Sequence, residues 1–419
     1  MTLKTKKKIF VIADSPLVPS GVGTQTKYMI EGLLMTGEYS FICLAGAIRH
    51  PDYTPIKVSP YEEDFIIYPV DGYGNPQIIR EMLNIHKPDV LWFMTDPRFF
   101  VWLWEMEDEI RKNVPMIYYH VWDNYPFPKF NKRFYDSNDV VCTISNVTDN
   151  IVRNVSPDVK CVRVPHTVDT EIFKKKSTLE LKALSDKIEP NGKMVFFWNN
   201  RNARRKQSGT LLFWFKEFLE NVGHDKAMLI MHTEPKDPNG QDLEHILREI
   251  NLTNGEVLLS TQKMPPEELA KVYSFADCTI NIADAEGFGL GTLESLACET
   301  PIIVNMTGGL QEQVTDENGN WFGFGIQPSS KAIIGSQDVP YIYEDRISKE
   351  DFLKAMTEFY NMNEEQRAEM GRKGRQHVLD NYHISQYRGQ WYEIFKDVTE
   401  NMGSWKNRKN YKNWEFIKL

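Results

Sequence analysis

Cysteine is scarce in this 419-residue chain, and its five cysteines show no metal-ligand spacing. An odd and dispersed set of cysteines, in a chain without a secretory signal, is typical of reduced thiols in a cytosol. The sequence also lacks any run of about 18 apolar residues, which is the length that a transmembrane helix needs. Its basic start leads directly into the strand-like run Ile9–Ala13 and not into the apolar core of a signal peptide. These absences predict a cytoplasmic protein without a transmembrane segment.

The composition is that of a folded chain with more than one domain. Hydrophobic residues make up 41% of the sequence and charged residues 26%, which supports sizeable cores and is unlike a disordered chain. The length favours about two or three domains. The net charge of −9 argues against a surface that coats nucleic acid, but it is compatible with a local basic groove.

Short apolar runs alternate with helical stretches twice along the chain. Such alternation predicts an α/β fold in which parallel sheets are covered by helices on both faces. The expected strands are 9–13, 41–44, 89–94, 116–119 and 140–144 in the first half, and 194–198, 227–231, 256–259, 278–282 and 301–304 in the second. Ligands of such sheets bind outside the carboxyl ends of the strands. We therefore expect two Rossmann-like domains whose loops face a central cleft.

A polar, turn-rich segment, 174–192, lies between the two sets of strands and is expected to be a linker. This places an N-terminal Rossmann-like domain at residues 1–175. A C-terminal Rossmann-like domain is expected at residues 190–385.

The most informative segment is Asp284–Ala297, which joins an apolar strand to a helical stretch. It contains three glycines at alternate positions, Gly287, Gly289 and Gly291. Glycine lets the backbone approach a ligand closely, and the amides and dipole of a helix N-terminus attract anions. Glu286 and Glu294 flank the loop, and carboxylates accept hydrogen bonds from hydroxyls. The loop thus offers backbone amides that suit a phosphate, and on either side of them carboxylates that suit hydroxyls. This arrangement indicates a sugar-nucleotide site, in which Glu294 binds the ribose and Glu286 binds the transferred sugar.

These two glutamates carry a resemblance to a known family. They match the Glu-x7-Glu signature of retaining glycosyltransferases with the GT-B fold, and the chain resembles glycosyltransferase family 4 in particular. The next segment, Thr300–Glu312, looks like the following strand and Gly-Gly turn of that family. Together with other segments, the resemblance extends over residues 9–398. Because the pair stands between a strand and a helix, it carries more weight than the spacing alone.

The resemblance implies a fold, a reaction and a set of site residues. The fold is GT-B, with two Rossmann-like domains whose parallel sheets face a central cleft. The reaction moves a hexosyl or pentosyl group, with retention, from a nucleoside diphosphate sugar with a UDP or GDP leaving group to an acceptor hydroxyl. The implied catalytic residues are His120, Arg201, Lys206 and Glu286. The implied donor-binding residues are Gly21, Gly23, Arg201, Lys206, Glu286, Gly287, Phe288, Gly289, Leu290 and Glu294.

The turn Asn199–Gln207 supplies the positive charge that a departing nucleoside diphosphate needs. It resembles the family's Gly-Arg-x4-Lys-Gly segment, with other residues in place of the two glycines. Preorganised cations near the developing charge lower the barrier. GT-A enzymes commonly use a metal ion held by an Asp-x-Asp motif, and no convincing motif of this kind is found here. We therefore expect Arg201 and Lys206 to neutralise the diphosphate without a metal or cofactor, and Arg204 and Arg205 to be solvated or to reach the acceptor.

Two loops of the first domain hold the remaining candidates. Gly21 and Gly23 resemble the family's amino-terminal glycine loop, which approaches the donor diphosphate or the acceptor, although an ordinary strand–helix turn fits them equally well. His120 follows the strand 116–119, at the place where family members often carry a histidine beside the transferred sugar. Asp123 comes three residues later and is expected to orient the His120 ring.

The end of the chain is expected to return to the first domain. Residues 365–385 look like the family's closing helices, and the resemblance implies that a final helix, 386–419, packs back on the N-terminal domain. From Gly403 onwards, basic and aromatic residues alternate. Such mixtures bind nucleic acid or make peripheral contact with a membrane surface, but we expect the aromatic side chains to pack on the neighbouring domain.

The acceptor and two alternative functions stay open at this point. Aromatic-rich segments at 95–104 and 118–127 suit sugar rings, lipid tails or nucleobases, so a sugar, a lipid-linked glycan, a small molecule and a modified nucleic acid are all candidate acceptors. One alternative is a catalytically silent GT-B protein that binds a sugar nucleotide, against which the intact pairs of glutamates and cations argue. The other is an epimerase or a phosphorylase of the same architecture, although no signature marks a lysine for pyridoxal phosphate.

Overall fold

The computed structural model describes residues 5–412, which divide into two compact units. Unit 1 takes its described residues from 5–166, 336–340 and 384–412. Unit 2 comprises residues 167–335 and 341–383.

The segment that was expected to be a linker is folded onto unit 2. It contains helix α7 (Thr178–Ile188), whose start is fixed by a capping box between Ser177 and Glu180. Just before the helix, the backbone N–H of Lys176 donates to Ser274 Oγ at 3.1 Å. Unit 2 therefore begins well before the expected start at residue 190. The segment is polar because it forms an exposed helix, and not because it is a linker.

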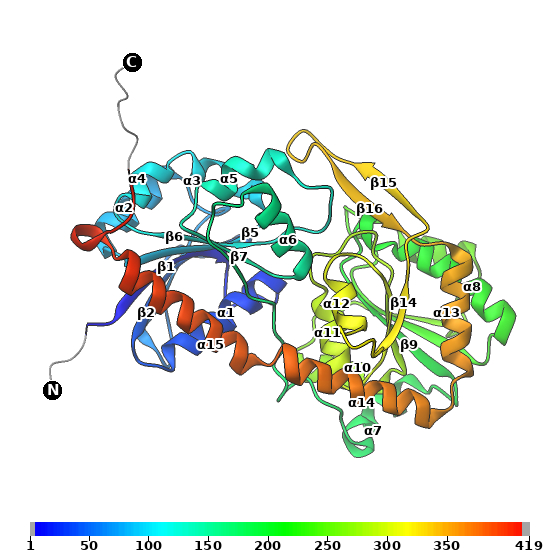
Figure 1. Cartoon of the computed structure of the whole chain (residues 1–419). Helices are drawn as coiled ribbons and strands as arrows, with labels where there is room; N and C mark the ends of the chain where they lie inside the picture. The colour runs from blue at the N-terminus through cyan, green and yellow to red at the C-terminus, as the bar shows by residue number, and fades with distance from the viewer. Residues whose placement is uncertain (1–4, 413–419) are drawn as a thin grey trace. The chain divides into compact units, whose positions relative to one another are not determined.

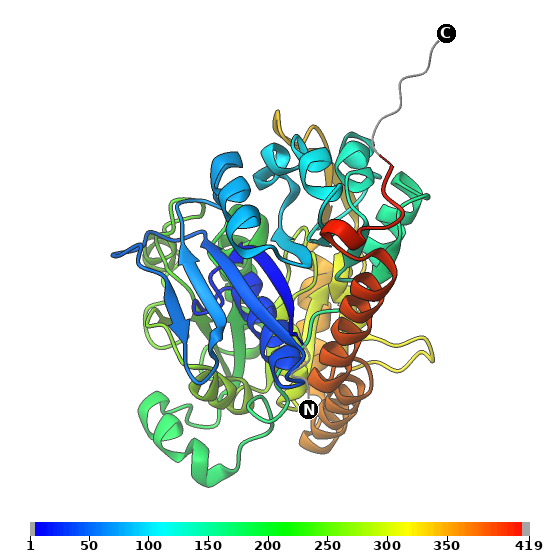
Figure 2. The same cartoon turned by 90° about the vertical axis from the view of Figure 1, so that its left-hand side faces the viewer.

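Unit 1 is built around an eight-stranded sheet in the order β3-β4-β2-β1-β5-β6-β7-β8. All neighbouring strands are parallel except β3, which is antiparallel to β4. Figure 2 shows the twist of its first strands. The strands are β1 (Lys7–Asp14), β2 (Tyr39–Gly46), β3 (Ile56–Val58), β4 (Glu62–Pro69), β5 (Val90–Thr95), β6 (Met116–His120), β7 (Val140–Thr143) and β8 (Cys161–Arg163).

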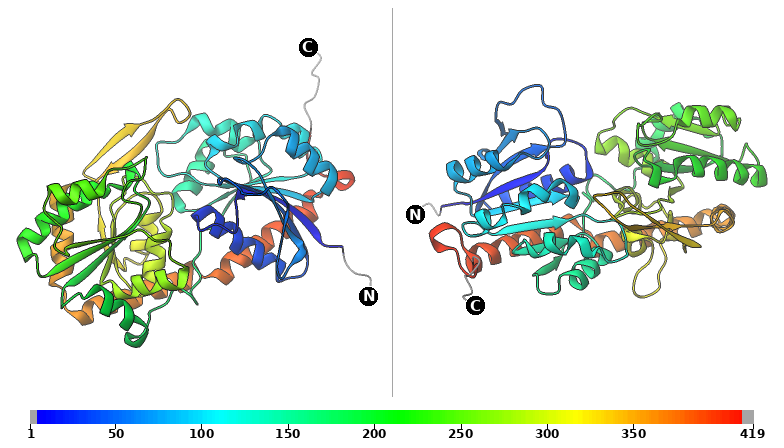
Figure 3. Two further views of the ribbon diagram at one scale, coloured as in Figure 1. Left: turned by 180° about the vertical axis from the view of Figure 1, so that it is seen from behind. Right: turned by 90° about the horizontal axis from the view of Figure 1, so that it is seen from above.

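Helices between and after these strands cover the sheet of unit 1. They are α1 (Gly21–Leu34), α2 (Pro76–His86), α3 (Val101–Trp104), α4 (Glu107–Arg111), α5 (Lys132–Asp136), α6 (Asn146–Val155) and the late helix α15 (Ile384–Asp397). Helix α15, drawn in red in Figures 1 and 3, packs beside α1, and the Tyr387 hydroxyl donates to the Gln25 carbonyl at 3.0 Å. The fully buried Trp391 lies edge-on to Trp92 and Tyr119, so the end of the chain completes the core of this unit.

The last helix is shorter than the range 386–419 expected from the sequence. Helix α15 ends at Asp397, a single π-helical turn (Val398–Met402) follows, and Gly403 takes a positive φ of 61° that stops the helix. The indole N–H of Trp405 then donates to the Pro88 carbonyl at 2.8 Å, and the Tyr411 hydroxyl bonds to Asp108. These two aromatic side chains of the tail thus pack on unit 1. Residues 413–419 of the expected tail lie outside the described residues.

Unit 2 holds a six-stranded parallel sheet in the order β11-β10-β9-β12-β13-β14. Numbered within the unit, this is the order 3-2-1-4-5-6 of a dinucleotide-binding sheet, which reverses direction between its first and fourth strands. The strands are β9 (Met194–Asn199), β10 (Ala227–His232), β11 (Val257–Ser260), β12 (Cys278–Asn281), β13 (Ile302–Asn305) and β14 (Gly323–Ile326). The switch point of unit 2 therefore lies between β9 and β12.

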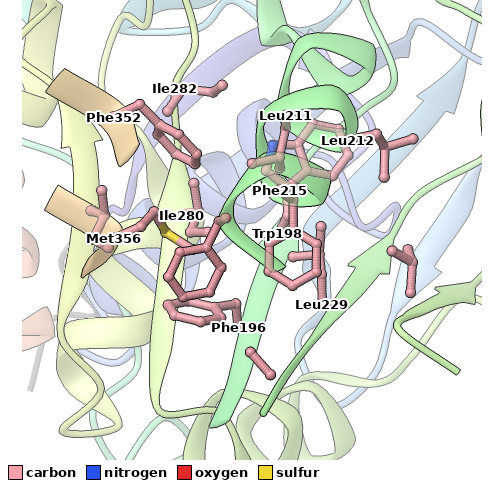
Figure 4. Close-up of a cluster of buried hydrophobic side chains, with 14 of the residues drawn as sticks. Phe196, Trp198, Leu211, Leu212, Phe215, Leu229, Ile280, Ile282, Phe352 and Met356 are labelled. Atoms are coloured by element: carbon pink, nitrogen blue, oxygen red, sulfur yellow. The ribbon is translucent and has the colours of Figure 1, made fainter. Parts of the chain in front are cut away.

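A core of large apolar side chains lies between the sheet of unit 2 and its helices. Figure 4 shows Phe196 and Trp198 of β9 facing Leu211 and Phe215 of helix α8 (Ser208–Val222), with Met356 of helix α13 (Lys349–Asn361) nearby, and all five side chains are fully buried. The further helices of unit 2 are α8 (Ser208–Val222), α9 (Leu243–Glu249), α10 (Pro266–Phe275), α11 (Leu290–Ala297), α12 (Gln311–Val314), α13 (Lys349–Asn361) and α14 (Glu364–Asn381).

A two-stranded antiparallel hairpin, β15 (Ser330–Ile334) and β16 (Ile342–Arg346), follows the six-stranded sheet. It forms a separate ribbon, drawn in gold in Figures 1 and 3. Among residues 5–412, no helix is long and apolar enough to span a lipid bilayer.

Candidate active site

The switch point of unit 2 brings two predicted segments together. Strands β9 and β12 are direct neighbours, with Phe197 opposite Thr279. The turn after β9 carries the short 3-10 helix Arg204–Lys206, and the loop after β12 carries Glu286 and leads into α11. The backbone N–H of Asp284 donates to the Arg205 carbonyl at 2.8 Å, which ties the two loops directly. The sheet order therefore places the cationic turn against the glycine loop.

Lys206 and Glu286 form an ion pair at the centre of this region. Their side chains are only 10% and 13% exposed, so each charge depends on the other for compensation. Burial alone would raise the pKa of Glu286, but the charges of Lys206 and Arg205 and hydrogen bonds from Lys206 and Asn281 outweigh it. The pKa of Glu286 therefore lies below its ordinary value, and the side chain is a carboxylate.

Arg205 is half-buried and lies against the loop after β12, so it is not the solvated side chain that was one of its two expected placements, while its reach to the acceptor stays a prediction. Its guanidinium donates from Nη1 to the carbonyl of Ala285 at 2.7 Å, beside Glu286. It also contributes to the low pKa of Glu286. The loop after β12 thus has two cations from one turn against it.

The glycine loop is held by close backbone contacts. Gly289 caps α11 with a positive φ of 91°, which favours glycine. The N–H of Gly309 donates to the carbonyl of Glu286 at 3.1 Å. A side chain at Gly309 would meet the Phe288 Cα at 2.6 Å, so the loop after β13 also requires a glycine. Gln313 donates to the Phe288 carbonyl at 2.8 Å. The amides at the start of α11 are therefore presented by a fixed loop.

Phe288 itself is a packing residue at the base of this loop. Its side chain is 3% exposed and lies edge-on to Tyr382. Only the backbone of Phe288 therefore belongs with the predicted donor-binding atoms. Leu290, the first residue of α11, is half-buried.

Glu294 lies in the second turn of α11 and has an uncharged partner. The Tyr273 hydroxyl donates to Glu294 at 2.8 Å and accepts from the Asn199 side-chain amide at 2.8 Å. Burial raises the pKa of Glu294 to about 7, and the hydrogen bond from Tyr273 opposes the shift. The two glutamates of the signature thus differ in their ionisation: cations keep Glu286 ionised, whereas Glu294 titrates near neutral pH. Tyr273 was not identified from the sequence, because nothing in its helix marks it.

Arg201 is not brought together with Lys206 and Glu286. Its guanidinium forms two hydrogen bonds to Asp237, at 2.7 and 3.2 Å, and its side chain is 64% exposed. The bonds from Arg201 and from Asn239 lower the pKa of Asp237 to about 2. The spacing of the sequence pair is present, but the turn directs Arg201 to the surface and Arg205 to the glycine loop.

The two predicted glycines of unit 1 lie where the packing of the fold accounts for them. Gly21 and Gly23 lie within the first turn of α1 and not in the preceding loop. A side chain at Gly23 would meet the Ser15 carbonyl at 2.6 Å, so this glycine allows the loop after β1 to pack on the helix. Gly21 is exposed at the helix start. A contact of either glycine with a donor stays a prediction.

His120 ends strand β6, as expected, but it has no exposed surface. Its ring nitrogens are 3.3 Å from the Tyr118 hydroxyl and 3.0 Å from the Tyr135 hydroxyl. These two hydroxyls orient the ring, a role that was expected of Asp123. Burial lowers the pKa of His120 to about 3, so the ring is neutral at physiological pH. This environment argues against proton transfer by His120. Its placement beside a sugar stays a prediction.

Comparison with known proteins agrees with the architecture and the motifs. Residues 185–377 match the family described as Glycosyl transferases group 1. Unit 2 carries a group 1 glycosyltransferase domain. The match includes Lys206, Glu286 and Glu294, and it confirms the predicted family. Within residues 5–412, no three His, Cys, Asp or Glu side chains gather as a candidate metal centre.

Individual relatives extend the comparison to both units. The D-inositol 3-phosphate glycosyltransferase of Acidothermus cellulolyticus is 35% identical over 77 residues, which are 18% of this chain and 17% of that relative, so the alignment spans less than a fifth of either. The sucrose-phosphate synthase of Thermosynechococcus elongatus has a TM-score of 0.74 at 16% identity, covering 94% of this chain and 99% of the other. Anabaena HepE, solved with UDP and glucose, has a TM-score of 0.67 at 12% identity, covering 93% and 99%. The GT-B fold is thereby confirmed.

Proposed function

We propose that the protein moves a sugar from a nucleoside diphosphate sugar to an acceptor hydroxyl, with retention at the anomeric carbon and without a metal ion. The observation that carries the proposal is the buried Lys206–Glu286 pair at the switch point of unit 2, beside the N-terminus of α11. A cation and helix amides suit a diphosphate, and a carboxylate suits sugar hydroxyls.

In this proposal the diphosphate binds against the first turn of α11, with Lys206 as its counter-ion. Arg205 adds a second positive charge at the same loop. As the glycosidic bond breaks, negative charge grows on the departing phosphate, and fixed cations and amides stabilise it. Lys206 then exchanges part of its contact with Glu286 for phosphate oxygens, which leaves the Glu286 carboxylate to accept hydrogen bonds from the transferred sugar.

The nucleoside is held further along α11. Glu294 accepts hydrogen bonds from the ribose diol, and the Tyr273 hydroxyl keeps the carboxyl group in place. The ionised form of Glu294 is the stronger acceptor. The raised pKa of Glu294 therefore makes this contact sensitive to pH near neutrality. The UDP bound to HepE makes a uridine nucleotide a reasonable first donor to assay, with guanosine as the second.

Retention is proposed to proceed on one face of the sugar. The bond between the anomeric carbon and the phosphate oxygen breaks, the acceptor oxygen bonds to the same face, and the departing phosphate oxygen takes the acceptor's proton. A double displacement would need a carboxylate poised beneath the sugar as nucleophile. Glu286 is engaged with Lys206 and with sugar hydroxyls in this scheme, so no covalent glycosyl-enzyme is expected.

A donor screen tests the proposal without knowledge of the acceptor. The wild-type protein is incubated with UDP- and GDP-sugars, and slow hydrolysis, with water as acceptor, is followed by release of the nucleoside diphosphate. We expect one donor to be hydrolysed, and Glu286→Gln to bind that donor but hydrolyse it much more slowly. Failure to bind any of these donors contradicts the proposal. Binding without hydrolysis supports instead a silent sugar-nucleotide-binding protein.

A further inference from the structure

The β15–β16 hairpin has buried acids at its base. Glu344 is 1% exposed and Asp345 is 4% exposed, although most of the ribbon around them is accessible. Buried carboxylates require charged or hydrogen-bonding partners. The proposed reaction gives these two residues no role, so the partners indicate what they do.

Glu344 binds the cationic turn that supplies Lys206. Arg204 donates from Nη1 to Glu344 Oε2 at 3.1 Å and from Nη2 to Oε1 at 2.5 Å. Arg346 donates to the same carboxylate at 3.0 Å. Burial alone would raise the pKa of Glu344, but the bonds from Arg204 and Arg346 hold it below its ordinary value. Because Arg204 directly precedes Arg205 and Lys206, the carboxylate fixes the start of the 3-10 helix that carries both.

Asp345 binds the other two loops of the candidate site. Its backbone N–H donates to the carbonyl of Asp284, two residues before Glu286, at 2.7 Å. Its carbonyl accepts from the Asn305 side-chain amide at 2.6 Å. Its Oδ2 accepts from the Thr307 hydroxyl at 2.8 Å, directly before the Gly308–Gly309 turn. Two consecutive residues of β16 therefore touch the loops after β9, β12 and β13.

We propose that strand β16 sets the relative position of the three donor loops, with Glu344 as a positioning residue that acts through Arg204 on Arg205 and Lys206. The inference rests on the proposed function, because these loops are proposed to bind the diphosphate. Glu344 does not touch the substrate in this account. A bidentate guanidinium–carboxylate contact restricts orientation as well as distance, which suits a positioning role. A change in the position of these loops should therefore affect binding of the diphosphate and not binding of the nucleoside.

The test uses ligands that separate these two halves. Affinities for UDP and for uridine, or for GDP and guanosine if that pair binds, are measured by calorimetry, with competition titrations for the weaker nucleoside. The variants are Glu344→Gln and Arg204→Met, and the second changes a side chain that is 61% exposed and is therefore expected to fold. The matched control is Glu217→Gln, which removes an exposed ion pair with Lys349 elsewhere in unit 2.

We expect Glu344→Gln and Arg204→Met each to weaken nucleoside diphosphate binding by about tenfold, as for residues coupled in one network. Nucleoside affinity should stay unchanged, and Glu217→Gln should match the wild type. Adding Arg204→Met to Glu344→Gln should cause little further loss, because both changes break the same contact.

Each other outcome overturns the inference in a recognisable way. If wild-type protein binds UDP or GDP and both variants bind it equally well, the positioning role is wrong while the proposed function stands. An equal loss of nucleoside and nucleoside diphosphate affinity, with a lower melting temperature, indicates a purely structural role. If the wild type binds neither nucleotide, the proposed function fails, and the inference fails with it.

Discussion

Replacing Lys206 by methionine isolates the electrostatics of the candidate site, because it keeps most of the side-chain volume and removes the charge. In the wild type, the Lys206 charge is the largest influence that lowers the pKa of Glu286 against the effect of burial. Without it, Glu286 keeps only the weaker influences of Arg205 and Asn281. We expect the pKa of Glu286 to rise above its ordinary value in the variant.

The size of the effect follows from the burial of the pair. Removing one partner of a fully buried ion pair costs about 3–5 kcal/mol. Arg205 remains near Glu286, and both side chains keep slight exposure, so we expect a loss of about 2 kcal/mol in the free energy of unfolding at about pH 8. This loss reflects an uncompensated carboxylate and not a lost apolar contact.

The sign of the pH dependence is fixed by the two pKa shifts. In the wild type the folded-state pKa of Glu286 is depressed, so the pair's contribution is present above the unfolded pKa of about 4.3 and is lost as the pH falls through the folded value. In Lys206→Met the folded pKa is raised, so protonation relieves the penalty as the pH falls toward about 4.3. The stability difference between the two proteins is therefore largest at high pH and smallest in acid.

Urea unfolding of both proteins at about pH 8 and about pH 4.5 measures this difference. Lys349→Met is the control, since Lys349 pairs with Glu217 at the surface, where a pair contributes at most about 1 kcal/mol. A loss for Lys206→Met that is the same at both pH values, or no larger than the loss for Lys349→Met, would contradict this electrostatic role of Lys206.

Three further predictions follow from the same contacts. Glu286→Gln should keep the fold and cut turnover by about 100-fold or more, since it alters a group that faces the developing transition state; steady-state rates with the hydrolysed donor would show whether turnover is unchanged. The pKa of Glu294 is raised to about 7, so donor affinity should increase as the pH rises through that value, and Glu294→Gln should abolish this dependence; a wild-type affinity that is flat with pH would speak against the ribose contact. Turnover should survive excess chelator, and loss that manganese or magnesium restores would contradict the role given to Lys206 and Arg205.

Much of the fold was accessible from the sequence, because buried parallel strands are apolar at almost every position. Each of the ten expected strands overlaps an observed one. Strand β14 was missed because two of its four residues are glycine, and a side chain at Gly323 would meet the Ile302 carbonyl at 1.9 Å. The hairpin β15–β16 was missed because its apolar residues, such as the 66% exposed Ile333, form no core pattern. Its buried Glu344 depends on Arg204, 140 residues earlier.

The part of the candidate site that could be predicted from the sequence is the part whose residues are close together in the chain. Glu286, Glu294 and the glycines between them belong to one strand–loop–helix segment, and the family spacing adds Lys206. The orientation of neighbouring arginines was not accessible, since Arg205 reaches Ala285 and Arg201 reaches Asp237 through tertiary contacts. The burial of His120 depends likewise on Tyr135, which belongs to another element. Residue type and spacing predicted candidate functional groups, whereas packing determined which of them meet.

The most direct test of the central claim is time-resolved proton magnetic resonance of donor hydrolysis. An α-linked UDP- or GDP-sugar is mixed with the protein, and the anomeric signals of the released sugar are recorded before mutarotation mixes them. We expect the α-anomer to appear first and Glu286→Gln to suppress its release. Initial release of the β-anomer would contradict retention and the mechanism built on the Lys206–Glu286 pair.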